Sequence, residues 1–255
     1  MGRFQKLLFL IFLIISAKSA ETINNKEIKI VLIGETGIGK SQLGNFILNK
    51  KGEFEVGNDF NSKTKDITEK TSYIDDKRMN IEMMVTIVDT PGLSDTNCDD
   101  SKIMDKIISK FENDDKIDGI VLVYSYKKPR KVQKDKELIN NIKKMFGEDI
   151  LKVRLKVVFT NYSTGEEFEE EKKEGNIKTQ INDIKILLNG IIDEEDLFFV
   201  NTYFLDSHKE LFYPDIGKLL KKIYEVKEKN VSMKNEKIEK EKLEFIEKEK
   251  EKMII

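Results

Sequence analysis

Eight consecutive residues near the start of the chain have the types and the spacing of a phosphate-binding loop. They are Gly34, Glu35, Thr36, Gly37, Ile38, Gly39, Lys40 and Ser41. Glycines let the backbone turn its N–H groups inward, where they cradle phosphate oxygens. Lys40 can then reach the β- and γ-phosphates of a nucleotide, while the Ser41 hydroxyl can bind Mg²⁺. We predict that these residues, together with Gln42, bind a nucleotide.

The segments on either side of this loop fit the same chemistry. Residues 28–33 form an apolar run typical of a strand, and residues 42–48 are compatible with a helix. A strand, a glycine-rich turn and a helix start are the context that a phosphate-binding loop requires. The positive end of the helix dipole then adds to the attraction for phosphate.

A second motif, Asp89-Thr-Pro-Gly92, ends a strand-like run over residues 81–88. On its own this sequence is a common turn, because Pro and Gly favour turns. Downstream of a phosphate-binding loop we predict that Asp89 holds Mg²⁺ through a water molecule and that the Gly92 N–H senses a γ-phosphate. The next residue, Leu93, stands where many GTPases orient the attacking water with Gln. We therefore expect slow hydrolysis unless help comes from elsewhere, such as a partner subunit.

A long polar stretch over residues 50–68 separates the first helix from the next two strand-like runs. Long loops in compact domains are usually functional, so we expect residues 52–68 to be the first nucleotide-sensing switch. Thr68 is the preferred candidate for a hydroxyl that closes onto Mg²⁺ when a triphosphate is bound, and Thr64 is the competitor.

Both motifs closely resemble those of the immunity-associated GTPases, also called the GIMAP or avirulence-induced family, which are relatives of septins and chloroplast-import GTPases. The resembling segments are Gly34-Glu-Thr-Gly-x-Gly-Lys-Ser41 and Asp89-Thr-Pro-Gly-Leu-x-Asp-Thr96. The resemblance extends over residues 27–225. It implies a P-loop GTPase fold (a G domain), binding of GTP or GDP with Mg²⁺, and dimerisation or filament formation across the nucleotide face.

A third segment, residues 130–137, resembles the family moderately. This resemblance makes Arg130 a candidate catalytic residue that stabilises charge in the site of a partner subunit. The alternative is a surface arginine in a basic loop.

The segment that chooses the base departs from the pattern of proteins with a clear preference for guanine. Such families place an Asp near the end of the fifth strand, whereas here Thr160 and Asn161 are followed by Tyr162 and Ser163, and Ser163 occupies the Asp position. Thr160 and Asn161 remain predicted nucleotide-binding residues, and Asn201 resembles the family's later base-side Asn. The alternative for Asn201 is a turn residue at a strand end. The choice between GTP and ATP therefore stays open.

Composition excludes several other classes of site. Charged residues make up 36% of the 255 residues, but the formal net charge is only −2 and the two signs are interspersed. Nothing in this pattern indicates a nucleic-acid-binding face, so we expect no nucleic-acid partner. The single Cys and single His exclude an intrachain disulfide and a His/Cys zinc site.

Residues 1–20 differ from the rest of the chain. Arg3 and Lys6 precede an apolar run over residues 7–15, and small residues follow, which is the pattern of a secretory signal peptide. The alternative is a hydrophobic helix docked on the domain. A secreted domain would meet little GTP. Localisation therefore stays open between secretory or endomembrane entry and a cytoplasmic, membrane-associated protein.

The remaining chain alternates strand-like and helix-like segments. This alternation predicts an α/β domain over residues 21–226, with a mostly parallel six-stranded sheet and helices on both faces. Residues 227–255 are mostly Lys and Glu and predict a charged helical extension. Its apolar residues keep no heptad spacing, which favours a solvated single helix over a partner-binding coiled coil.

Three functions are compatible with these features. The first is a GTP-dependent, dimerising switch with slow Mg²⁺-dependent hydrolysis. The second is a septin-like scaffold that holds the nucleotide without meaningful turnover. The third is an ATP-binding P-loop protein, which the serine at position 163 leaves open.

Overall fold

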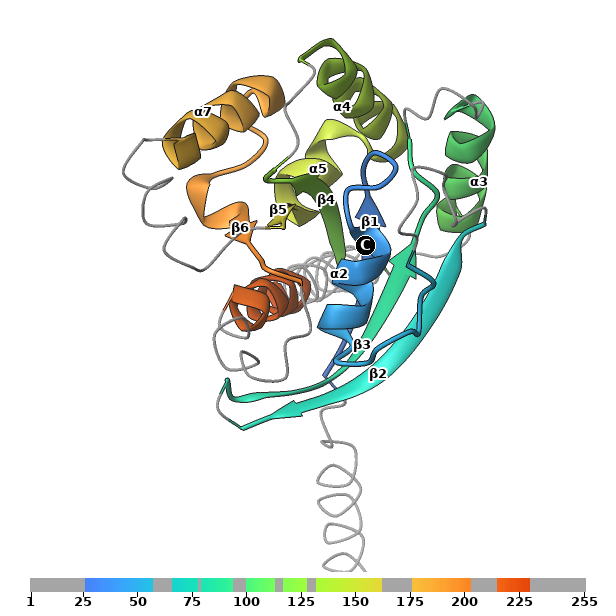
Figure 1. The fold of residues 1–255 in the computed structure, drawn as a ribbon, viewed down its shortest axis with the longest axis vertical. Helices are drawn as coiled ribbons and strands as arrows, with labels where there is room; N and C mark the ends of the chain where they lie inside the picture. The colour runs from blue at the N-terminus through green and yellow to red at the C-terminus, as the bar shows by residue number, and fades with distance from the viewer. Residues whose placement is uncertain are drawn as a thin grey trace, which may run out of the picture.

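The fold is described from a computed structural model. It describes residues 26–56, 66–77, 79–93, 100–112, 117–127, 132–161, 176–202 and 215–229. The signal-like segment 1–20 and most of the charged extension 227–255 lie outside the described residues. The described residues form one sheet with helices on both faces (Figure 1).

The sheet has six strands in the order β2-β3-β1-β4-β5-β6. The strands are β1 (Glu27–Ile33), β2 (Thr68–Asp76), β3 (Ile81–Asp89), β4 (Gly119–Ser125), β5 (Leu155–Thr160) and β6 (Leu197–Phe199). All neighbouring pairs are parallel except β2 and β3, which form an antiparallel hairpin at one end of the sheet. This arrangement confirms the predicted mostly parallel, six-stranded sheet.

Burial explains why these segments are strands. Every residue of β4 is buried, as expected for a central parallel strand that is covered on both faces. In β3 buried and exposed residues alternate from Ile81 to Val85, because this part of the hairpin is covered on one face only. The hairpin turn includes Asn80, whose φ of 49° is a left-handed conformation that Asn tolerates.

The helices divide the core into two layers. They are α2 (Lys40–Ile47), α3 (Asp100–Glu112), α4 (Val132–Phe146), α5 (Glu148–Arg154), α7 (Asn176–Leu188) and a helix over residues 215–229, with a short 3₁₀ helix, η1 (Glu194–Asp196). One core cluster joins α2 and the helix over 215–229 to one face of the sheet. The other joins α3, α4, α5 and α7 to the opposite face (Figure 1). None of the helices among the described residues has both the length and the apolar character needed to cross a bilayer.

This topology places the loops at the carboxyl end of the sheet in a defined order. β1 lies between β3 and β4, so the loop after β1 is flanked by the segment after β3. Ligands of open parallel sheets bind at the carboxyl ends of the strands. The predicted phosphate-binding loop follows β1 at this edge.

Candidate nucleotide-binding site

The loop between β1 and α2 has the backbone geometry of a phosphate cradle. Gly37 and Gly39 have φ values of 70° and 94°, in the left-handed region that favours glycine. Gly39 is the N-cap of α2 and provides no capping side chain. The first N–H groups of a helix have no partners within the helix, so they are suited to a bound anion.

The second motif lies in direct backbone contact with this loop. The Leu93 N–H donates a hydrogen bond of 3.1 Å to the Gly34 carbonyl. A Cβ at Gly92 would lie only 2.1 Å from the Thr36 hydroxyl oxygen, and a Cβ at Gly34 would lie 2.6 Å from the Val123 carbonyl oxygen. Only glycine therefore fits at these two positions, where the backbones approach each other closely.

The Lys40 side chain is buried and folds back over the loop. Its Nζ donates hydrogen bonds to the carbonyl oxygens of Gly34, at 3.1 Å, and Glu35, at 2.8 Å. These two carbonyls hold the ammonium group at the rim of the cradle. A positive charge held there is suited to the phosphates of a nucleotide.

Ser41 and Asp89 bring two oxygen ligands together. The Ser41 hydroxyl donates a hydrogen bond of 2.6 Å to Asp89 Oδ2, and Asp89 is only 1% exposed. Hydroxyl and carboxylate oxygens are ligands that Mg²⁺ accepts, and this ion usually keeps several waters and binds phosphate as well. The described residues contain no group of three or more His, Cys, Asp or Glu side chains that could hold a metal. One hydroxyl and one carboxylate fit a Mg²⁺ ion whose other ligands are waters and the phosphates of a nucleotide.

Thr68, the predicted switch hydroxyl, lies beside this pair. It is the first residue of β2 and pairs with Asp89 across the hairpin. Residues that face each other across an antiparallel pair project from the same face of the sheet. Thr68 is exposed, so a ligand can reach it. Thr64, the competing candidate, lies outside the described residues.

Leu93 is fully buried, at 0% exposure, in the core cluster that includes α3 and α4. Its backbone is bonded to the phosphate loop, while its side chain is part of the core. The absence of a water-orienting side chain at this position follows from the residue type and also from its place in the core.

The end of β5 is attached to the phosphate loop through Thr160. Its hydroxyl oxygen lies 2.5 Å from the Ile38 carbonyl oxygen and 3.1 Å from that of Tyr124. The next residue, Asn161, has a φ of 58° and donates from Nδ2 to the Ser125 hydroxyl at 3.1 Å. Ser125 was not among the predicted residues; the available signal was its position at the end of a buried strand.

The segment after β6 reaches the same edge. Gln42 donates from Nε2 to the Thr202 carbonyl at 2.9 Å, and half-buried Asn201 directly precedes Thr202. The structure therefore gathers the loop residues 34–42, Asp89, Gly92, Thr68, Thr160, Asn161 and Asn201 at one edge of the sheet. Arg130 and Ser163 lie outside the described residues.

Sequence reasoning missed the contacts that anchor the start of the predicted switch, residues 52–68. The Asn45 side chain accepts a hydrogen bond from the Phe54 N–H at 2.8 Å and donates one to the Phe54 carbonyl at 2.9 Å. The Phe54 ring packs on Gly44, where a Cβ would lie 2.9 Å from it. These contacts fasten the start of the stretch to α2. The only sequence signal was an Asn and a Gly within an amphipathic helix.

Comparison with known proteins gives relatives for most of this domain. A model described as the AIG1 family matches residues 28–253. Immune-associated nucleotide-binding protein 9 of Arabidopsis thaliana is 31% identical over 153 residues, which are 59% of this chain and 41% of that protein. Septin-8 of Xenopus tropicalis is 38% identical over 87 residues, which are 33% of this chain and 20% of that protein. The match thus spans about two fifths of the length of the plant relative.

Solved structures of chloroplast translocon proteins share the fold. Toc33 from Arabidopsis thaliana in complex with GDP and Mg²⁺ has a TM-score of 0.58 at 17% identity, covering 85% of this chain and 89% of that chain. A structure from work on dimerization and GTPase activity of atToc33 and psToc159 has a TM-score of 0.61 at 16% identity, covering 82% and 86%. Because the family model matches most of the sequence, the chain belongs to the AIG1 family.

Proposed function

We propose that this protein binds GTP or GDP together with Mg²⁺, and that the bound nucleotide controls pairing of its G domain with a second copy. The observation that carries this proposal is the 2.6 Å hydrogen bond between Ser41 and Asp89 beside the Lys40-bearing loop. The names of its plant relatives include nucleotide binding, and Toc33 has been crystallised with GDP and Mg²⁺. The match covers only part of each plant relative. The role of this chain is therefore inferred from the geometry of its own site.

Each residue of the site has a defined task in this proposal. The loop N–H groups and the Lys40 ammonium group bind phosphate oxygens, and Ser41 and Asp89 hold the metal, Asp89 through water. The bound Mg²⁺ would neutralise charge on the β- and γ-phosphate oxygens. The Gly92 N–H and the Thr68 hydroxyl respond to the γ-phosphate, which links the state of the nucleotide to the hairpin β2–β3.

Hydrolysis by an isolated domain is proposed to be slow. Leu93 is buried and cannot orient a water molecule. Help would then come from a second copy across the nucleotide face, with Arg130 as the residue that supplies charge. This inference is supported by the neighbouring translocon proteins, for which dimerization is described as important for GTPase activity.

Single-turnover hydrolysis by the full chain at low and high protein concentration tests this proposal. A rate that rises with concentration and falls in the Arg130→Ala variant is expected. The Lys127→Ala variant removes another basic side chain from the segment after β4. It is the control and should keep the rate. A rate that is independent of concentration would contradict catalysis by pairing.

A second candidate is a septin-like scaffold that holds nucleotide without turnover. The similarity to septin-8 and the buried Leu93 favour it. Under this alternative the chain binds GTP with Mg²⁺, yet no phosphate is released at any protein concentration. The same experiment therefore separates the two functions.

We also propose that residues 1–20 direct the chain to a membrane system. The support is the basic start followed by a short apolar run. N-terminal sequencing of the native protein tests it: a mature chain that begins near Ala20 supports secretory entry, and an intact Met1 contradicts cleavage.

A further inference from the structure

Among the described residues, no strand lies along the outer edge of β2. Of the strands that the structure describes, only β3 pairs with β2, which is nine residues long. The Met84 N–H donates to Lys26, on the β1 side, at 2.7 Å, and Met84 faces Tyr73 across the hairpin. In an antiparallel pair, two residues that face each other either both point their N–H and C=O groups toward each other or both point them away. Tyr73 therefore directs these groups away from β3, toward the open edge, and so do Thr71 and Asp75.

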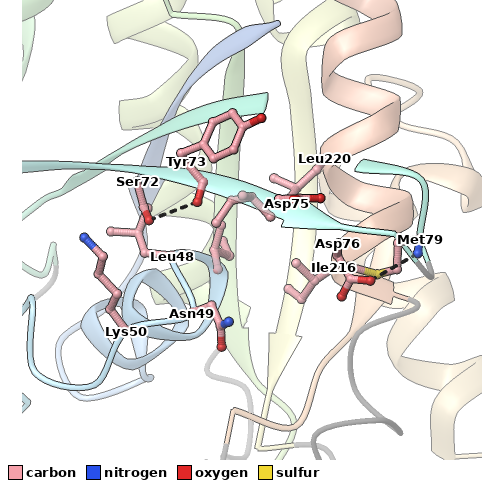
Figure 2. Close-up of a pocket in the computed structure, with 12 residues that line it drawn as sticks. Leu48, Asn49, Lys50, Ser72, Tyr73, Asp75, Asp76, Met79, Ile216 and Leu220 are labelled. Carbon is pink, nitrogen blue, oxygen red and sulfur yellow. Dashed lines mark hydrogen bonds between the residues drawn. The ribbon is translucent and has the colours of Figure 1, made fainter. Parts of the chain in front are cut away.

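A groove runs along this edge on the α2 side of the sheet (Figure 2). It has a volume of about 350 Å³ and lies between the end of α2, the strand β2 and the helix over residues 215–229. Its apolar lining comes from Ile47, Leu48, Ile74, Met79, Ile216 and Leu220. An open strand edge beside apolar pockets is the arrangement by which proteins bind an added strand.

The charges of β2 indicate which strand is added. If a second β2 runs antiparallel to the first with Tyr73 opposite Tyr73, Lys70 faces Asp76, twice by symmetry. Glu69, which already pairs with Lys29 at 3.1 Å and with Lys110 at 3.3 Å in its own chain, then faces Lys77. A register centred on Ser72 would instead place Glu69 opposite Asp75, which are like charges. An edge lysine usually discourages pairing, but in the first register Lys70 is matched by a carboxylate.

We propose that two copies of this chain associate through their β2 strands, in the antiparallel register centred on Tyr73, to form a continuous sheet. In this register Tyr73, Thr71 and Asp75 use the N–H and C=O groups that point outward. The second copy's Ile74 lies opposite Ser72, at the border of the apolar groove. Opposite charges and buried apolar side chains on the groove side both stabilise the pair.

This contact is separate from the nucleotide face. It rests on strand β2 and requires no nucleotide, whereas the pairing described under the proposed function does. If both contacts form, each copy has two different two-fold interfaces, and copies then link into a linear array. The edge contact is therefore tested with GDP bound and again in the Lys40→Ala variant, where it persists.

Charge reversal tests the register. Lys70→Glu places two carboxylates opposite each other, because the new side chain faces Asp76 of the second copy. This variant is expected to weaken self-association of the full chain by roughly a hundredfold, measured by analytical ultracentrifugation. The double variant Lys70→Glu/Asp76→Lys restores it, because each new charge again faces its opposite.

Asp75→Lys, a charge reversal at a position opposite the uncharged Thr71, is the matched control and has little effect. A wild-type chain that stays monomeric, or a double variant as weak as Lys70→Glu, overturns the proposal.

A disulfide gives a second test that does not depend on charge. Two copies of Tyr73→Cys, in a Cys98→Ser background, would have Cα atoms about 5.5 Å apart, within disulfide range. Two copies of Thr71→Cys would be about 14 Å apart along the strands, too far for a disulfide. Oxidation is expected to crosslink only the first variant. Equal crosslinking of both, or none of Tyr73→Cys, contradicts the register.

Discussion

The two ends of the parallel sheet are built in different ways. At the carboxyl end, Lys40 and Leu93 contact the loop backbone near Gly34, and glycines allow the segments to approach closely. At the opposite end, charged side chains connect β1, β4 and the helix over residues 215–229. There Asp118 accepts hydrogen bonds from the Lys29 N–H at 2.9 Å and from Lys227 Nζ at 3.4 Å. The first end is organised for binding a ligand, and the second for holding the helix over residues 215–229 on the domain.

An ion pair between a buried lysine and a half-buried aspartate connects β5 with η1. Lys156 on β5 is 2% exposed, and its Nζ lies 3.1 Å from Asp196 of η1. Burial lowers the pKa of Lys156, while Asp196 opposes that shift. The same region includes an ion pair of 2.6 Å between Glu195 and Lys222, which connects η1 with the helix over residues 215–229.

Breaking the ion pair between Lys156 and Asp196 is expected to have the largest effect on stability. Lys156→Ala leaves Asp196 without its buried cation and should lower the free energy of unfolding by about 3 kcal/mol. Chemical unfolding monitored by circular dichroism measures this loss. The double variant Lys156→Met/Asp196→Asn should recover most of it, because neither charge of the pair remains. A Lys156→Ala variant as stable as the wild type would show that the pair is not structural.

Removing Lys40 should weaken nucleotide binding while leaving the stability of the nucleotide-free protein nearly unchanged. Lys40→Ala is expected to weaken nucleotide affinity by roughly a hundredfold, because charge-assisted hydrogen bonds to phosphate are lost. The stability of the nucleotide-free protein should change little. Isothermal titration with Mg·GDP measures the affinity, and Lys50→Ala at the far end of α2 is the control. A comparable loss of affinity in Lys50→Ala would refute a specific role for Lys40.

Thr160 tests how β5 supports the site. Thr160→Val keeps the shape of the side chain but removes the contact with the Ile38 carbonyl oxygen. We expect a loss of about 1 kcal/mol, which is roughly a fivefold loss of nucleotide affinity if the contact positions the loop. Nucleotide titration and unfolding of this variant show whether its affinity or its stability changes. An unchanged affinity with reduced stability would assign Thr160 to the core alone.

Asp118 predicts a small pH effect at the opposite end of the sheet. Burial raises its pKa above the ordinary value of 3.8, although the Lys29 N–H and Lys227 oppose the shift. The folded state therefore keeps this proton to higher pH than the unfolded state. As pH rises above 3.8 through the folded pKa, the contribution of Asp118 to stability should fall.

Unfolding of the wild type and Asp118→Asn between about pH 4 and pH 6.5 tests this sign. The stability of the wild type minus that of the variant should decrease as pH rises. Other carboxylates, such as Glu148 beside Lys143, have lowered pKa values and change both proteins alike. A difference that increases with pH would mean that the ion pair with Lys227 outweighs burial.

The same contrast explains what could be predicted from the sequence. The phosphate loop was predictable because its residues are consecutive and each has a chemical role. The helix α4 (Val132–Phe146) is marked in the sequence by an apolar stripe of period 3.6. The two apolar runs over residues 28–33 and 81–88 predicted β1 and β3 to within about one residue, since such runs mark strands but do not fix their ends.

Contacts between distant residues were not predictable. Lys227 and Asp118 are 109 positions apart, and no local pattern connects them. Lys156 looks like a surface residue in sequence, yet it lies on the buried strand β5 with Asp196 3.1 Å away. Likewise, Leu93 could be recognised as unable to orient water, but its place in the core required the fold.

The central claim is that the carboxyl end of the sheet binds a guanine nucleotide with Mg²⁺. Displacement of a fluorescent GDP analogue from the full chain by GTP or by ATP, with Mg²⁺ and again with EDTA, tests it most directly. We predict displacement by GTP at far lower concentration than by ATP, and loss of binding of the analogue in EDTA. Equal or stronger displacement by ATP, or binding that is unchanged in EDTA, would contradict the claim.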